Sequence, residues 1–174
     1  AKAYNNMGVS LKKLKGDPVS AINSYIRALK IKPDYAEAYN NLGVALKEFV
    51  FNEPNTGLME IIVSLIDQRT FCRPKDIAPA AISLLKLEPT LRELLESCSA
   101  VTLRQSLQKT MLTLAELPLL LKLMSVCPIA DLELEGILVD IRSALLSSVD
   151  EISISPTTLH FQSALALQCF TNEY

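Results

Sequence analysis

The polar residues most suited to binding chemistry are two asparagine pairs, Asn5-Asn6 and Asn40-Asn41, which lie 35 residues apart. Asparagine is a poor helix former because its side chain competes for backbone hydrogen bonds. A carboxamide can, however, donate and accept hydrogen bonds at once, which suits it to binding an extended peptide backbone. The alternative is that both pairs are solvated residues of a repeated pattern.

Four lysines, Lys2, Lys12, Lys13 and Lys47, lie in the same two stretches. Their charge could attract an acidic peptide or a carboxylate. A solvated helix face is the commoner explanation of such a group.

The sequence offers little for catalysis. His160 is the only histidine, and no Ser or Cys stands beside it in a recognisable motif. The five glycines are too far apart for a phosphate-binding or dinucleotide-binding loop. The acidic run "DLELE" (131–135) is typical of a first helical turn, where acids favour the helix dipole. We therefore expect no catalytic residue, no metal ion and no cofactor in this chain.

The cysteines have no metal-ligand spacing and lie among apolar residues, so we expect reduced thiols in a core and not a disulfide framework. The longest apolar run, "LPLLLKLMSV", is too short to cross a bilayer. These features favour a cytoplasmic protein with no membrane partner. The cysteines are Cys72, Cys98, Cys127 and Cys169.

A repeat organises the elements that carry the asparagines. "AKAYNNMGVSLKKL" (1–14) and "AEAYNNLGVALKEF" (36–49) agree at nine of fourteen positions. Between them, apolar residues recur at helical spacing, Asp17-Pro18 supplies an N-cap and a first-turn proline, and Pro33 ends the pattern. The sequence therefore predicts helices over 3–14, 18–31 and 36–49.

This pattern resembles the tetratricopeptide repeat (TPR), in which two antiparallel helices, A and B, form each unit. The resemblance covers about 50 residues, and one extra residue in "LKKLKGD" gives a period of 35 instead of 34; we expect it in the turn between A and B, where insertions cost little. The matching positions are Tyr4, Met7, Gly8, Leu11, Ala21, Tyr25, Ala28 and Pro33, and then Tyr39, Leu42, Gly43 and Leu46.

The resemblance implies that helix A lines a concave groove that binds a protein or peptide. In some TPR arrays an asparagine ladder at the place of Asn6 and Asn41 holds the peptide. Glu37 and Glu48 lie in or near the same groove. The expected peptide-binding residues are Lys2, Asn5, Asn6, Val9, Lys12, Lys13, Asn40, Asn41, Val44 and Lys47.

The second half is also helical, and no strand-like alternation extends over a useful length, so the predicted fold is all-α. No second helix B is recognisable after Phe49. We therefore expect two domains, TPR repeats over 1–50 and a non-repeat α-helical domain over 51–174. The expected helices of the second half are 57–71, 73–87 (with Pro79 near its first turn), 89–98, about 101–113, about 117–126, a helix capped by Asp131, and 157–171.

Residues 51–174 also resemble the helical segment that follows TPRs in bacterial proteins ending in a class I S-adenosylmethionine-dependent methyltransferase domain. The similar runs include "RPKDIAPAAISLLKLEPTLRELL" and "ALALQCFTNEY". This resemblance implies a piece cut before a catalytic domain, consistent with a chain that starts inside a helix pattern with no N-cap.

The charge is uneven: residues 1–50 hold eight Lys and Arg against four Asp and Glu, whereas residues 51–174 hold nine against fifteen. A net charge of −2 argues against nucleic acid as the main partner. The leading hypothesis is a non-catalytic, protein-binding helical scaffold. The alternatives are a substrate-recruiting or lid part of a methyltransferase, and a homo-oligomer formed through the exposed edge of the repeats.

Overall fold

The computed structural model describes residues 1–174 except 48, 69–71, 98–99, 148–155 and 172–174. The described residues form ten α-helices and one π-helical turn, with no strand, which confirms the all-α prediction. Contacts between Cα atoms divide the chain into two compact units, unit 1 (Ala1–Ser83) and unit 2 (Leu84–Tyr174). The helices are α1 (Lys2–Ser10), α2 (Pro18–Ile31), α3 (Ala36–Leu46), α4 (Thr56–Asp67), α5 (Pro74–Leu85), α6 (Pro89–Ser97), α7 (Ala100–Ala115), α8 (Pro118–Val126), α9 (Leu132–Ser147) and α10 (Pro156–Thr171).

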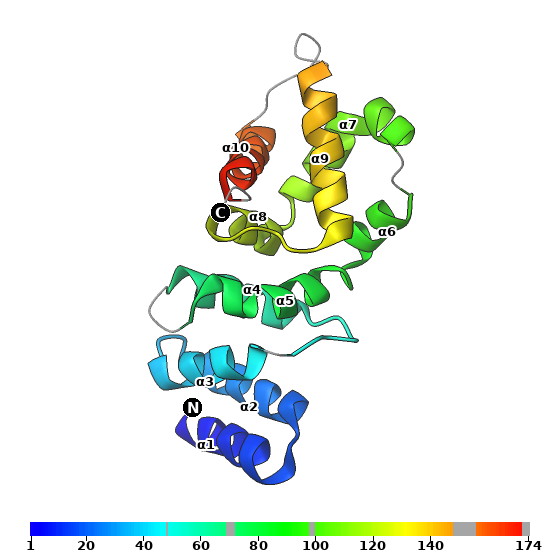
Figure 1. Cartoon of the computed structure of the whole chain (residues 1–174). Helices are drawn as coiled ribbons and strands as arrows, with labels where there is room; N and C mark the ends of the chain where they lie inside the picture. The colour runs from blue at the N-terminus through cyan, green and yellow to red at the C-terminus, as the bar shows by residue number, and fades with distance from the viewer. Residues whose placement is uncertain (48, 69–71, 98–99, 148–155, 172–174) are drawn as a thin grey trace. The chain divides into compact units, whose positions relative to one another are not determined.

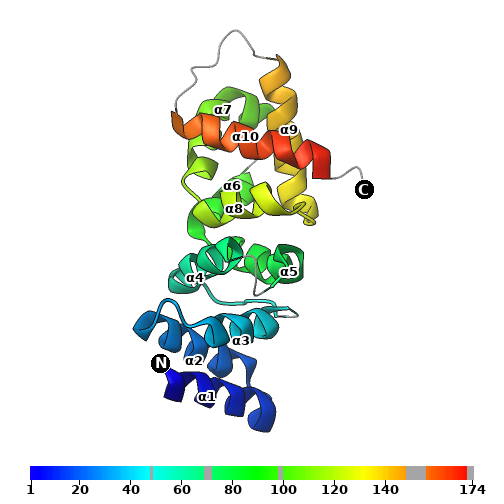
Figure 2. The same cartoon turned by 90° about the vertical axis from the view of Figure 1, so that its left-hand side faces the viewer.

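In unit 1, α1, α2 and α3 follow one another side by side, and α4 and α5 come next (Figures 1 and 2). The close approach of α1 and α2 depends on a glycine, because a Cβ atom added to Gly8 would lie 2.5 Å from Cε1 of Tyr25. The guanidinium of Arg27 lies 5.9 Å from the ring centroid of Tyr4, which adds a cation–π contact between the same two helices.

The helix signals around α2 are confirmed. The carboxylate of Asp17 accepts a hydrogen bond from the Ser20 backbone N–H at 3.0 Å, Pro18 is the first helical residue, and the helix ends at Ile31, before Pro33.

The extra residue of the first repeat lies inside a helix and not in the turn, which corrects the prediction. Residues Leu11–Lys15 form a π-helical turn directly after α1, and Gly16 follows in the left-handed region with φ 60°. A π turn holds one residue more than an α turn because its hydrogen bonds run from i to i+5. The helix widens to accommodate the insertion, and Gly16 then reverses the chain toward α2.

A helix does follow α3, although its sequence lacks the TPR pattern. The hydroxyls of Tyr39 in α3 and Ser64 in α4 share a hydrogen bond, so these helices are in contact. The buried residues of α4 repeat the spacing of Ala21, Tyr25, Ala28 and Leu29 in α2, but with large aliphatic side chains. They are Leu58, Ile62, Leu65 and Ile66.

Unit 1 ends at Ser83 and not at residue 50. Helix α4 and most of α5 therefore fold with the repeat helices. The division into TPR repeats over 1–50 and a non-repeat domain over 51–174 concerns repeat content and stays a prediction. One helix detail differs from expectation. Pro79 lies at the sixth residue of α5, where it removes one backbone hydrogen bond. The backbone of α7 is kinked at Ser106 (φ −123°).

Unit 2 is organised around α7, which contacts α6, α8, α9 and α10. Met111 and Leu114 of α7, Leu123 of α8 and Phe161 of α10 are almost completely buried. Asp131 caps α9, as predicted, by accepting a hydrogen bond from the Leu134 N–H at 3.1 Å. The Lys86 ammonium pairs with Asp131 at 3.1 Å and with Glu133 at 2.6 Å, which ties the chain after α5 to the start of α9.

Candidate peptide-binding surface

The predicted binding residues lie on α1, on the π turn and at α3, two helical segments that contact each other. Two residues are half-buried, Val9 and Asn41, and one is buried, Asn5. Glu48 lies outside the described residues. The exposed members of the set are Lys2, Asn6, Lys12, Lys13, Asn40, Val44 and Lys47.

Asn5 is not part of an exposed surface, contrary to the expectation for helix A. Its side chain is 0% exposed, its Nδ2 donates to Glu37 Oε1 at 3.0 Å, and its Oδ1 accepts from Asn41 Nδ2 at 2.9 Å. Glu37 also accepts from the Tyr35 hydroxyl at 2.9 Å. That hydrogen bond raises the pKa of Tyr35, because it stabilises the protonated phenol beside a carboxylate. These contacts fasten α3 to α1.

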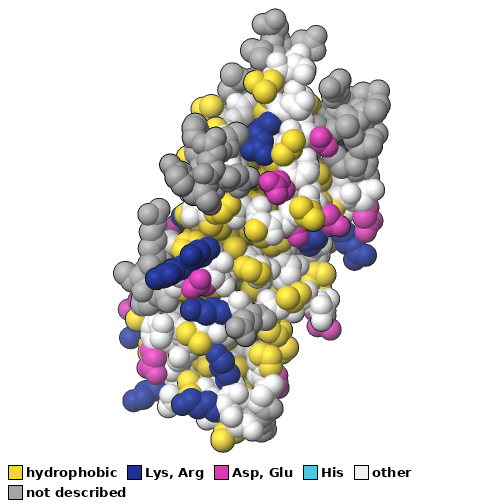
Figure 3. Space-filling view, viewed as in Figure 1, with side chains coloured by type: hydrophobic (Ala, Val, Ile, Leu, Met, Phe, Trp, Pro, Cys, Tyr) yellow, Lys and Arg dark blue, Asp and Glu magenta, His cyan; other side chains and the backbone are white. Residues whose placement is uncertain are grey.

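Two of the four lysines are engaged within unit 1. Lys12 Nζ donates to the Val44 carbonyl oxygen at 3.3 Å, and Lys47 pairs with Asp76 of α5 at 3.3 Å. Unit 1 shows several Lys and Arg side chains on the face drawn in Figure 3. Lys2 and Lys13 are the predicted lysines that have no polar partner among the described residues, so they are the cations most available to a ligand.

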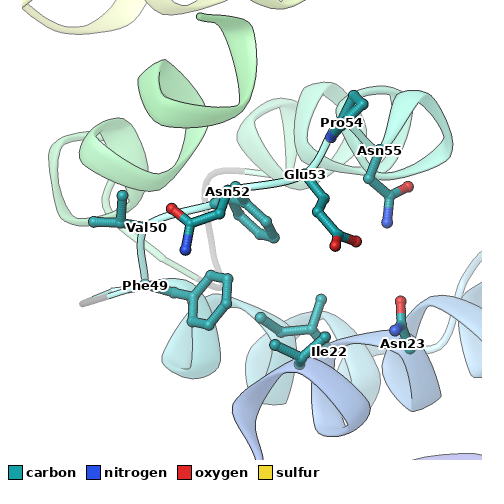
Figure 4. A pocket seen from close by; sticks show the side chains of 10 residues that line it. Ile22, Asn23, Phe49, Val50, Asn52, Glu53, Pro54 and Asn55 are labelled. Carbon is teal, nitrogen blue, oxygen red and sulfur yellow. The ribbon is translucent and has the colours of Figure 1, made fainter. Parts of the chain in front are cut away.

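A cleft that the sequence did not predict lies between α2 and the segment after α3. Its volume is about 310 Å³. Ile22 and Phe49 form its apolar floor in Figure 4, and the Glu53 carboxylate points toward Ile22. Phe49 packs edge-to-face on Phe51 with ring centroids 4.6 Å apart. The only sequence signal was the run "FVFNEPN", which marks the end of the repeat but does not show which helix it will cover.

The cleft wall is held in place at both ends. The Phe51 N–H donates to Ser83 Oγ at 3.0 Å, and Asn55 Oδ1 caps α4 by accepting from the Leu58 N–H at 3.0 Å. The recess is therefore preformed in unit 1.

The residues considered for catalysis and metal binding lie apart from this surface. His160 is exposed on α10, in unit 2. Cys127 is buried and Cys72 half-buried, both as free thiols, and burial raises the pKa of each. Cys98 lies outside the described residues, and the side chain of Cys169 is not described. Within the described ranges, no three His, Cys, Asp or Glu residues come together as metal ligands do.

The fold of unit 1 is that of paired helices stacked in an array. Comparison with known families adds that a model described as "TPR repeat" matches residues 15–48, which include α2 and α3. This match supports a TPR protein and a helical scaffold for protein–protein interaction. No curated protein and no solved structure gives a significant match. No helix in the described part of the chain has both the length and the apolar character needed to cross a membrane.

Proposed function

We propose that unit 1 binds an extended, acidic segment of a partner protein along the exposed residues of α1 and α3. The observation that carries this proposal is the pairing of α1 with α3 through Asn5, Glu37 and Asn41. Because these part-buried contacts fix the two helices side by side, Asn6 and Asn40 remain exposed next to the junction and free to bind a peptide backbone.

Charge supports an acidic partner. Lys2 and Lys13 are exposed near opposite ends of the first helical segment, and residues 1–50 hold eight basic against four acidic residues. An acidic segment would be drawn toward this surface, with an association rate that falls as salt is added.

The test uses an array of unstructured peptides of graded net charge, probed with the full chain, followed by fluorescence anisotropy on the tightest binder. We expect acidic peptides to bind best, and Asn6→Ala combined with Asn40→Ala to weaken binding at least about tenfold, the equivalent of about 1.4 kcal/mol. The matched control is Asn23→Ala, an exposed asparagine on α2. Unchanged affinity in the double variant, or equal loss in the control, would refute the proposal.

The alternative concerns residues 51–174 as a substrate-recruiting or lid part of a methyltransferase. It is supported by the resemblance of that segment alone, because the family match ends at residue 48. The two proposals differ in one measurement: a scaffold binds its peptide equally well with and without S-adenosylmethionine. That the chain itself is non-catalytic stays a prediction.

A further inference from the structure

Helix α9 has a second apolar face besides the one that it buries in unit 2. Leu132, Val139 and Leu146 are 89%, 48% and 80% exposed, whereas the apolar side of a surface helix normally faces the core. They are seven residues apart, so they follow one another along one side of the helix. The opposite side holds the buried residues, which are Leu134, Ile137, Leu138, Ile141 and Ala144.

Small residues occupy the places between the three exposed apolar ones. Gly136 and Ser143 each lie four residues after one of them and three before the next, which is the spacing of a coiled-coil seam. Both are exposed, and a Cβ atom added to Gly136 would meet no atom within 4 Å. Figure 3, drawn from the same side as Figure 1, shows separate hydrophobic side chains along the course of α9. We call the set Leu132, Gly136, Val139, Ser143 and Leu146 the seam of α9.

The alternation of large and small residues makes the seam complementary to itself. When a second α9 runs in the opposite direction, one register sets Val139 of each copy over Gly136 of the other. The same register sets Leu132 of each copy over Ser143 of the other, because both pairs are centred on the same point of the helix. A large side chain then lies over a small residue at four places, which lets the two helices approach closely.

The charges beside the seam favour the antiparallel direction. In the antiparallel register, Glu135 of each copy lies beside Arg142 of the other, which gives two pairs of opposite charge. In a parallel pair, Glu135 would instead lie beside Asp140 of the second copy, and like charges would meet. On the other flank of the antiparallel pair, Glu133 approaches Asp140, but Glu133 is already paired with Lys86 at 2.6 Å.

We propose that α9 is a dimerisation helix, which docks through its seam on α9 of a second copy of this chain in the antiparallel direction. A foreign helix with flanks of one sign would set a like charge against either Glu135 or Arg142, whereas the reversed copy matches both. This inference concerns unit 2, goes beyond the peptide-binding proposal and does not depend on it.

The size of the seam predicts a weak dimer. From Leu132 to Leu146 the helix rises about 21 Å, at about 1.5 Å per residue. A single helix pair of that length buries less than the about 800 Å² per partner of a standard stable interface. The dimer should therefore form reversibly as the concentration of the chain increases.

The first test is sedimentation equilibrium of the full chain over a range of concentrations. We expect the mass to rise from that of one chain toward that of two. Val139→Asp should weaken self-association at least about tenfold, because it sets a carboxylate into the apolar seam. The matched control is Leu159→Asp on α10, since Leu159 is 52% exposed and Val139 48%, and it should leave the dimer unchanged. Circular dichroism verifies that both variants stay folded.

The second test exchanges the charges beside the seam. Arg142→Glu leaves two acidic residues on that flank, and Glu135→Arg leaves two basic ones. Each variant alone should self-associate about fivefold more weakly, and an equimolar mixture of the two should recover the original association. The folding of each variant is the same alone and in the mixture, so recovery reports the contact between copies.

Any of three results overturns the proposal. One is a chain that stays monomeric at every concentration, or that loses association equally in Val139→Asp and Leu159→Asp. Another is stronger self-association of Glu135→Arg alone, which would mean a parallel pair in which the new arginine meets Asp140. The last is a dimer that Met7→Asp on α1 dissociates and Val139→Asp does not, because the interface would then lie on the repeat helices.

Discussion

Asn5 and Asn40 occupy the same position of the repeat and have opposite environments. Asn5 is completely buried between α1 and α3, while Asn40 is exposed. The difference comes from the neighbouring helix. Asn5 of α1 lies against α3, which supplies Glu37 and Asn41 as hydrogen-bond partners. A single residue type thus acts as an internal fastener in one copy and as an open hydrogen-bonding group in the other.

Replacing Asn5 with aspartate should be costly. Asn5→Asp removes the donor to Glu37 and sets a second carboxylate beside it, so we expect a loss of about 2–3 kcal/mol in the free energy of unfolding. Asn40→Asp, the matched control on a solvated surface, should stay within about 0.5 kcal/mol of the original chain. Urea unfolding monitored by circular dichroism measures both. Equal effects would mean that Asn5 is not the fastener described.

The binding residues were predictable as a helix face but not one by one. Spacing placed Lys2, Asn6 and Asn40 on a polar side, where the structure leaves them exposed. It placed Asn5 there too, since a polar residue on such a face is usually solvated. Asn5 is buried because α3 packs against it, and the residue spacing within α1 does not predict that contact.

The sequence predicted which segments form helices. It predicted where a helix begins or ends only where a capping residue, a proline or a glycine marks that end. Helix α2 has a cap, a first-turn proline and a stop, and its predicted bounds, 18–31, are the observed ones. Helix α3 was expected to reach 49 but ends at Leu46, where no glycine or proline marks the end. Helix α4 was expected from 57 and begins at Thr56, because Asn55 caps it.

One buried side chain of α10 holds the end of α8 and the segment that follows it. Gln168 of α10 is 3% exposed; its Nε2 donates to the carbonyl oxygens of Met124 at 2.6 Å and Cys127 at 2.9 Å, and its Oε1 accepts from the Ile129 N–H at 2.9 Å. It therefore satisfies backbone groups that the end of α8 leaves unpaired. Nothing in the sequence around Gln168 predicts this role.

Removing that amide should destabilise unit 2. Gln168→Leu leaves buried backbone groups without partners, and we expect a loss of about 3 kcal/mol in unfolding free energy. Gln162→Leu, on the half-buried side of the same helix, is the control and should change it by no more than about 0.5 kcal/mol. Thermal and urea unfolding both report the difference. A neutral Gln168→Leu would show that water or relaxation replaces these hydrogen bonds.

At the scale of the molecule, the change in sequence character and the edge of the compact unit do not coincide. The repeat pattern and the excess of basic residues end near residue 50, whereas unit 1 continues to Ser83. Two links cross residue 50 within unit 1: Tyr39 to Ser64 and Lys47 to Asp76. Helices α4 and α5 therefore pack with the repeat helices, although their sequences lack the repeat pattern.

Truncation should reveal that boundary. We expect a chain of residues 1–83 to unfold cooperatively in urea, and a chain of residues 1–50 to lose most of its helical circular dichroism. The reason is that the shorter chain loses the links of Tyr39 to Ser64 and of Lys47 to Asp76, and isolated short helices are marginal in water. Cooperative unfolding of residues 1–50 with the same midpoint would place the folding boundary at the end of the repeat instead.

The π-helical turn at Leu11–Lys15 affects how repeats of this kind should be aligned. Each residue added within a helix rotates the later side chains of that helix by about 100° about its axis. An alignment that places the gap in the loop keeps Lys12 opposite Lys47, although Lys12 lies in the π turn and Lys47 follows the end of α3 at Leu46. Ligand contacts inferred for the end of helix A from 34-residue relatives should therefore be shifted by one residue before they are assigned to this chain.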